Sequence, residues 1–99
     1  MPAFLVAQIN IHDRSEYAKY EEGFMSILSR HNGSLMVVDE SAQLLEGCWD
    51  CTRTVLLAFP SEEEARGWYN SEEYQTLMQY RLAASDGNVV LLKGLDINT

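Results

Sequence analysis

The first segment of the chain, Ala3–Ile11, alternates between two sets of side chains. One set comprises Leu5, Ala7, Ile9 and Ile11, and the other comprises Phe4, Val6, Gln8 and Asn10. A repeat of two residues predicts a β-strand with these sets on opposite faces. Apolar runs predict three more strands over residues 34–38, 54–59 and 88–93, and residues 43–46 predict a short continuation of the second strand or a hairpin arm. Pro60 ends the third strand, and Asp86-Gly87 predicts a turn before the last.

The region after the first strand follows a helical repeat. Asp13 or Ser15 begins the helix, because Asp13 has Glu16 three residues later in the spacing of a capping box. Asn32-Gly33 ends it, and Gly33 is expected to adopt the left-handed conformation. The apolar stripe of this helix consists of Tyr17, Tyr20, Phe24, Ile27, Leu28 and His31.

A second helical region follows Pro60. It begins at Ser61 with Glu64 in the same capping spacing, stops at Asn70-Ser71, and restarts over residues 71–84. The restarted helix is expected to present Tyr74, Leu77, Met78, Arg81 and Leu82 inward.

The order of these elements is βαββαβ, with an interruption in the second helix. Two helical crossovers on an antiparallel sheet place both helices on one face. The sequence therefore predicts an α+β fold of ferredoxin-like architecture. A chain of 99 residues has room for one core, so we expect a single domain over residues 1–99.

The sheet face away from the helices should be polar if it meets water. The strands at residues 54–59 and 88–93 are instead apolar on both faces, and we expect Val55 or Leu57 to point away from the helices. Such a face would expose several hundred Å² of apolar surface, about the limit for a monomer. The sequence therefore predicts a homodimer, packed sheet to sheet.

The charge of the chain limits its other partners. The sequence has 15 acidic and 7 basic residues, for a formal net charge of −8. This balance opposes binding to nucleic acid and to an anionic membrane surface. The apolar run Ala3–Ile11 is too short to span a bilayer and does not resemble a signal peptide. We therefore expect a cytoplasmic protein without a nucleic-acid or membrane partner.

Short motifs occur in a fixed order along nearly the whole chain. They are Asp13 with Tyr17 and Tyr20, Gly33, Glu46-Gly47 with Trp49, Arg53, Phe59-Pro60-Ser61, Trp68-Tyr69, Ser71, Glu73-Tyr74-Gln75, Arg81, Asn88 and Gly94. In this order the chain resembles the domain-of-unknown-function family 1330, small bacterial ferredoxin-like proteins. The resemblance implies a dimeric α/β barrel, in which two sheets close around a shared interior, and it implies no reaction. The chain departs from the family at Val37-Val38-Asp39, where relatives often carry a basic residue.

Cys48-Trp49-Asp50-Cys51 has the spacing of a redox dithiol or of half a zinc site. A redox pair usually lies at a helix N-terminus, whereas this one lies in a loop between strands. A structural zinc site needs four ligands, and only His12 and His31 are available to complete one. We interpret the cysteines as incidental thiols and expect no metal site and no cofactor.

His12 follows the first strand beside Asp13, so it is a weak candidate for a catalytic base held by a carboxylate. A solvated residue at the end of a strand is the more common role for such a histidine. The sequence has no Ser-His-Asp order and no glycine-rich phosphate loop.

A set of polar and aromatic residues is the remaining candidate for a site. It consists of Tyr17, Tyr20, Arg53, Trp68, Tyr69, Tyr74, Arg81 and Asn88. Aromatic side chains with a few polar groups are typical of small-molecule pockets, here between the helices and the sheet. Arg81 would meet an anionic ligand. The alternative is that these residues pack the core and that Arg81 pairs with Asp86 or Glu73.

Three functions are compatible with this sequence. The first is a homodimer that binds a small anionic or aromatic molecule in each subunit. The second is a cofactor-independent enzyme, a monooxygenase, isomerase or decarboxylase, that uses His12, Asn10 or Trp68. The third is a structural dimer without a ligand.

Overall fold

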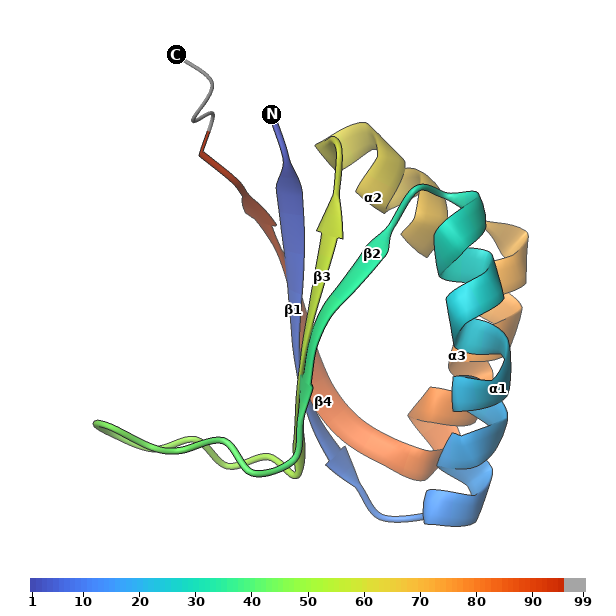
Figure 1. The fold of residues 1–99 in the computed structure, drawn as a ribbon. Helices are drawn as coiled ribbons and strands as arrows, with labels where there is room; N and C mark the ends of the chain where they lie inside the picture. The colour runs from blue at the N-terminus through green and yellow to red at the C-terminus, as the bar shows by residue number, and fades with distance from the viewer. Residues whose placement is uncertain (96–99) are drawn as a thin grey trace.

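A four-stranded antiparallel sheet carries three helices on one side in the computed structural model, which describes residues 1–95 (Figure 1). The elements are β1 (Ala3–Ile11), α1 (Arg14–Arg30), β2 (Ser34–Asp39), β3 (Arg53–Phe59), α2 (Glu62–Tyr69), α3 (Glu72–Ala84) and β4 (Ser85–Lys93). The strands lie in the order β2-β3-β1-β4, and each neighbouring pair is antiparallel. The prediction of an α+β, ferredoxin-like fold is confirmed.

Each helix begins at the polar residue that the sequence indicates. The side chain of Asp13 accepts a hydrogen bond from the Glu16 amide at 3.1 Å. Ser61 accepts one from the Glu64 amide at 3.2 Å, and Ser71 does the same at the start of α3. These bonds satisfy amides that have no partner within the helix. The predicted interruption at residues 70–71 is confirmed.

The end of α1 differs from the prediction. Asn32, rather than Gly33, has the left-handed backbone, with φ of 62°. Asparagine tolerates this conformation better than most residues. Gly33 is needed for space instead, because a Cβ there would lie 2.4 Å from Cδ1 of Leu28 and 2.7 Å from Cε1 of Phe59.

The predicted turn at Asp86-Gly87 is wrong. β4 begins at Ser85, directly after α3, and Gly87 pairs with Ile9 inside the sheet. A Cβ at Gly87 would lie 2.4 Å from the backbone oxygen of Gln8. The glycine is therefore explained by a close approach of two strands, which has the same sequence signal as a turn.

Replacing Gly87 with Ala is expected to destabilise the protein by about 1–3 kcal/mol, the usual cost of an overpacked position. Gly67 is the matched control, because it lies inside α2 and a Cβ there meets nothing within 4 Å. Gly67→Ala is expected to stabilise by about 0.5–1 kcal/mol through its helix propensity. Urea unfolding of both variants measures the difference; two changes of the same sign would contradict this explanation of Gly87.

The expected hairpin arm at residues 43–46 is also wrong. Residues 40–52 contain no strand, and we call this segment the arm. It leaves the end of the sheet on the side opposite the helices (Figure 1). Residues 41–50 are all exposed.

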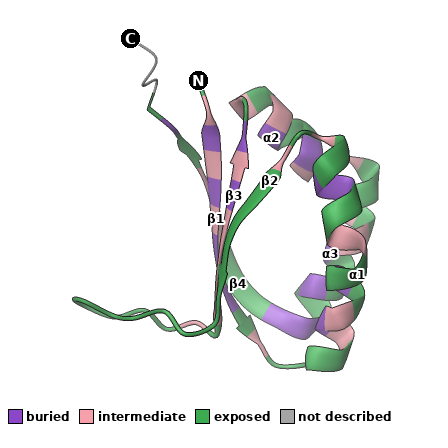
Figure 2. Cartoon of the chain, in the orientation of Figure 1, coloured by how far each residue is buried: buried purple, intermediate pink, exposed green. Residues whose placement is uncertain are grey.

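The two faces of the sheet have different surroundings. The inner face packs on the helices and is buried along β1 at Leu5, Ala7 and Ile9 (Figure 2). Leu57 pairs with Leu5 and Val55 with Ala7, so both lie on this inner face. The expectation that one of them points outward is wrong, and the outward residue is Leu56.

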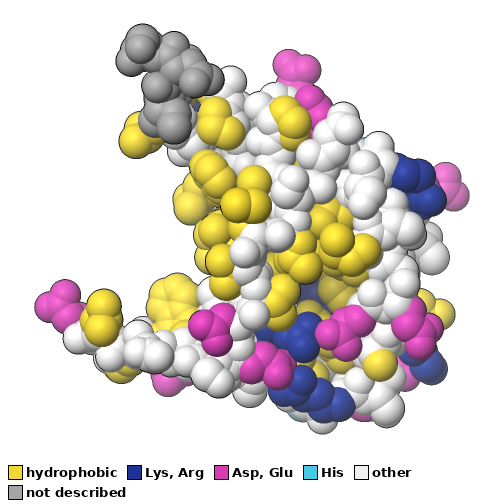
Figure 3. Space-filling view, viewed as in Figure 1, with side chains coloured by type: hydrophobic (Ala, Val, Ile, Leu, Met, Phe, Trp, Pro, Cys, Tyr) yellow, Lys and Arg dark blue, Asp and Glu magenta, His cyan; other side chains and the backbone are white. Residues whose placement is uncertain are grey.

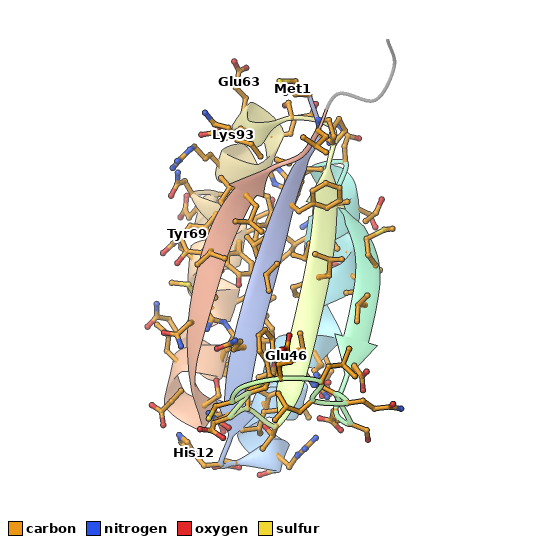
Figure 4. All side chains as sticks on the ribbon, turned by 90° about the vertical axis from the view of Figure 1, so that its left-hand side faces the viewer. Met1, His12, Glu46, Glu63, Tyr69 and Lys93 are labelled. Atoms are coloured by element: carbon orange, nitrogen blue, oxygen red, sulfur yellow. The ribbon has the colours of Figure 1, made fainter. Side chains whose placement is uncertain are left out.

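The outer face carries no helix, and its strands lie open to view in Figure 4. Its residues, taken from the strand register, are Phe4, Val6, Gln8, Asn10, Ser34, Val37, Asp39, Thr54, Leu56, Ala58, Asp86, Asn88, Val90 and Leu92. Val37, Val90 and Leu92 are about half exposed. Within residues 1–95, no helix is long and apolar enough to cross a membrane.

Candidate functional site

A cavity of about 210 Å³ lies between the inner face of the sheet and the helices. Its walls are formed by Leu5, Ala7, Ile9, Tyr17, Tyr20, Glu21, Phe24, Met25, Leu35, Val38, Arg53, Val55, Leu57, Trp68, Tyr74, Arg81 and Val89. In Figure 3, hydrophobic side chains line the hollow between sheet and helices, and acidic and basic side chains lie along its lower edge. The walls are therefore mainly apolar, with a small number of polar groups.

Arg81 supplies a buried positive charge to this cavity. The residue is 6% exposed, and its Cζ lies 5.9 Å from the centre of the Tyr20 ring. Burial alone would lower the pKa of Arg81, but Tyr74 and Tyr20 beside it raise the pKa above its ordinary value. The guanidinium is therefore charged at neutral pH.

No carboxylate oxygen within residues 1–95 lies within 4.0 Å of the Arg81 guanidinium. The two acids expected as partners are engaged elsewhere: Glu73 contacts Arg30 and His31, and Asp86 lies 3.9 Å from His12. The alternative that Arg81 pairs with Glu73 or Asp86 is wrong. No carboxylate of the described residues neutralises this charge, and Tyr20 and Tyr74 are its polar neighbours.

Aromatic side chains surround this charge. The hydroxyls of Tyr20 and Tyr74 form a hydrogen bond of 2.7 Å, and the Tyr74 ring stacks on Trp68 at 4.0 Å between centres. Trp68 is 1% exposed, and within residues 1–95 its indole Nε1–H has no acceptor. A buried donor without a partner carries the cost of its lost hydrogen bonds to water.

The tyrosines of the cavity are neutral hydrogen-bonding groups. Burial, and then the neighbouring Tyr74, raise the pKa of Tyr20 well above its ordinary value. Burial also raises the pKa of Tyr74 and of Tyr17, against the effect of nearby arginines. At neutral pH each hydroxyl keeps its proton and can donate it to an acceptor.

These raised pKa values predict a loss of stability in alkali. Below pH 10, the tyrosines carry their protons in both the folded and the unfolded chain. At higher pH the unfolded chain releases a proton that folded Tyr20 retains, so unfolding is favoured by up to about 1.4 kcal/mol per pH unit for each such group. Urea unfolding is expected to show that the free energy of unfolding declines less between pH 9 and 11 in Tyr20→Phe than in Tyr80→Phe. The second variant alters a more exposed ring. Equal declines would contradict the burial of the Tyr20 hydroxyl.

Arg53 lies at the edge of the cavity in an ionic cluster. It pairs with Ile9 in the sheet, so its side chain is on the inner face, 5.1 Å from the Tyr17 ring. Its guanidinium contacts Glu21 at 2.7 Å and Glu40 at 3.1 Å. Arg53 is therefore neutralised by its own chain, in contrast to Arg81.

Six of the eight predicted ligand-binding residues line the cavity: Tyr17, Tyr20, Arg53, Trp68, Tyr74 and Arg81. Tyr69 packs on Trp68 and Tyr74 without lining it. Asn88 pairs with Gln8 and lies on the outer face, as does Asn10. His12 is exposed at the end of the sheet.

Sequence reasoning missed several residues of the wall. Glu21 lies four residues after Tyr17, and Met25 four residues after Glu21, so the helical repeat was a usable signal for both. Leu35 and Val38 gave no such signal. An irregularity in β2 between Leu35 and Val37 brings both to the inner face, although strict alternation would separate them.

The two cysteines lie away from the cavity. Both are free thiols; Cys48 is exposed, and the Sγ of Cys51 lies 3.5 Å from Oγ1 of Thr54. No group of three or more His, Cys, Asp or Glu side chains in residues 1–95 is arranged to hold a metal ion.

Solved structures with the same fold include proteins of known and unknown function. A protein of unknown function from Rhodopseudomonas palustris is 18% identical, with a TM-score of 0.80 over 96% of this chain and 83% of that one. A dimeric ferredoxin-like protein of unknown function from Jannaschia is 12% identical, with a TM-score of 0.70 over 95% and 100%. SnoaB, a cofactor-independent oxygenase from Streptomyces nogalater, is 12% identical, with a TM-score of 0.66 over 98% and 96%. At these identities the likeness shows the fold alone.

Sequence comparison identifies the family more directly. No curated protein matches this chain significantly. The sequence profile described as "Domain of unknown function (DUF1330)" matches residues 2–95, which is nearly the whole chain. The chain therefore belongs to the DUF1330 family.

Proposed function

We propose that this protein is a homodimer that binds a small, anionic ring compound in the cavity of each subunit. The observation that carries the proposal is the Arg81 guanidinium, which lines the cavity and has no carboxylate partner within residues 1–95. A ligand anion would supply the missing charge through paired N–H···O bonds. The ligand's binding free energy would then offset the cost of burying the arginine.

The walls support a ring as the body of this ligand. An engineered apolar cavity of roughly 150 Å³ holds benzene. The cavity of about 210 Å³ therefore has room for one ring with a carboxylate. Trp68 and Phe24 offer aromatic contacts. A carboxylate attached to an aromatic ring matches both the charge and the walls.

The outer face of the sheet supports the homodimer. It is apolar along its centre, at Val6, Leu56 and Val90, and no element within residues 1–95 covers it. The Jannaschia relative of the same fold is dimeric. Packing two such faces together removes the apolar patch from water, which is the main favourable term in association.

A cofactor-independent enzyme is the second candidate function. It is supported by the fold shared with SnoaB and by Trp68 in an apolar cavity. Of the residues expected to serve such chemistry, His12 and Asn10 lie outside the cavity. A structural dimer without a ligand would leave the Arg81 guanidinium facing the cavity with no carboxylate from residues 1–95 to neutralise it. Ligand binding therefore has the most support.

Thermal unfolding with added benzoate tests the binding proposal, with benzamide as the neutral compound of the same shape. We expect benzoate to raise the melting temperature and benzamide to raise it less, because only benzoate neutralises Arg81. Measuring the melting temperature with other ring carboxylates then shows which ring size stabilises the protein most. Equal shifts from benzoate and benzamide, or none from any ring carboxylate, would contradict the proposal.

A further inference from the structure

The arm, residues 40–52, presents hydrophobic side chains that its own chain does not cover. Leu45 is 92% exposed and Leu44 is 56% exposed, and Trp49 is also exposed. Loops of this length without secondary structure are uncommon in small domains and usually have a function. Two adjacent exposed leucines at the tip indicate a contact outside the chain.

Hydrogen bonds hold the base of the arm and leave its tip free. Asn10 donates to the Asp50 carbonyl at 3.0 Å, and the Trp49 Nε1–H donates to Oγ1 of Thr54 at 2.8 Å. Within residues 1–95, no hydrogen bond involves residues 42–48. The base therefore fixes the arm to the sheet, while the tip has no internal support.

The position of the arm relates it to the outer face. The arm leaves the sheet on the side away from the helices and, at Glu46, crosses in front of one end of the strands (Figure 4). Any molecule packed on the outer face must therefore lie beside the arm. The arm and the face form one continuous surface.

A second copy of the chain fits this surface. The register places 14 residues on the outer face. A standard interface uses about 20–30 residues on each side, so the face alone is too small and the arm supplies the difference. Each copy has a net charge of −8, so two copies repel and gain from contact through uncharged groups. The tip supplies such groups, because Glu46 is the only charged residue in 41–49, and the acids Glu40 and Asp50 lie at the base of the arm.

We propose that each arm crosses to the partner subunit of the homodimer and buries Leu44 and Leu45 against it. This inference rests on the proposed sheet-to-sheet homodimer. The exchange is reciprocal, since a two-fold axis gives both subunits the same contacts. The arm then adds apolar contact area to the interface.

Replacing both Leu44 and Leu45 with Ser tests the arm. Sedimentation equilibrium is expected to show a dimer dissociation constant at least about tenfold higher than that of the unchanged protein, because four leucines per dimer are lost. Leu82→Ser is the matched control. The expectation that Leu82 points inward is wrong, because it is 52% exposed on α3, on the other side of the sheet from the outer face. Both variants are expected to keep their monomer fold, measured by circular dichroism.

Hydrogen exchange provides an independent readout. The amides of residues 42–48 are expected to exchange more slowly in the unchanged protein than in the variant Leu56→Asp, whose charge at the centre of the outer face is expected to keep it monomeric. The proposed role of the arm would be overturned if the double variant had an unchanged dimer dissociation constant and the amides of 42–48 exchanged rapidly in the unchanged protein. That result would leave the homodimer itself intact. An unchanged protein that is monomeric at micromolar concentration would overturn both.

Discussion

Replacing Leu56 with Asp is expected to convert the proposed homodimer into a monomer. Leu56 lies between Val6 and Val37 on the outer face, at the centre of the proposed interface. Each dimer would bury two carboxylates without partners, and an uncompensated buried charge costs about 3–5 kcal/mol. The dissociation constant of the dimer is therefore expected to rise by at least about 1,000-fold. Light scattering would change from twice 11.3 kDa to 11.3 kDa.

Leu82→Asp serves as the control for this prediction. It places the same charge on an exposed leucine of α3, on the far side of the sheet from the outer face. It is expected to leave the dimer unchanged. Circular dichroism of the Leu56→Asp protein should show a folded monomer, because the substituted side chain lies on the open face. A Leu56→Asp dimer as stable as the Leu82→Asp dimer would show that subunits do not meet through this face.

The fold could be predicted from the sequence where its signals are local. The caps at Ser61 and Ser71 depend on a few neighbouring positions and could be predicted, and Asp13 was one of two candidates for the first cap. The apolar repeats also predict the buried sides of β1 and α1, although the repeat in α3 wrongly placed Leu82 inward. The outward side of β3 depends instead on pairing with β1. Because residues 54–59 are apolar on both faces, their composition cannot tell whether Leu56 or Leu57 points outward.

Part of the candidate site could also be predicted from the sequence. The aromatic residues and Arg81 follow helical stripes, so their convergence on one cavity could be expected. Tyr69 is adjacent to Trp68 in the helix and so points in another direction. The isolation of Arg81 could not be predicted, because Glu73 is engaged by Arg30 and His31 at the distant end of α1. Such competition between partners appears only in three dimensions.

Replacing Arg81 with Met is expected to abolish the response to benzoate while the protein remains folded. Methionine keeps most of the packing volume and removes the charge. Saturation at 100 times the Kd would stabilise the unchanged protein by about 2.7 kcal/mol. For a chain of this size, that corresponds to roughly 10–20 °C in melting temperature. The variant is expected to show almost none of this shift.

The stability of the Arg81→Met variant without ligand separates two roles of the arginine. Losing one partner of a buried ion pair would cost about 3–5 kcal/mol. Arg81 has no carboxylate partner within residues 1–95, and its contact with the Tyr20 ring, at a desolvated site, is worth about 2 kcal/mol. Removal of its charge also relieves the cost of burying it, so we expect a net change within about 1 kcal/mol.

Arg66→Met is the control, because Arg66 is an exposed residue of α2 that pairs with Glu62 outside the cavity. It is expected to keep the full benzoate shift, since surface pairs of this kind contribute little to stability. A benzoate shift retained in Arg81→Met would place the anion elsewhere. A loss of 3 kcal/mol or more in Arg81→Met would instead assign Arg81 to holding the fold together. The proposed function requires the other result, in which binding is lost and the fold is kept.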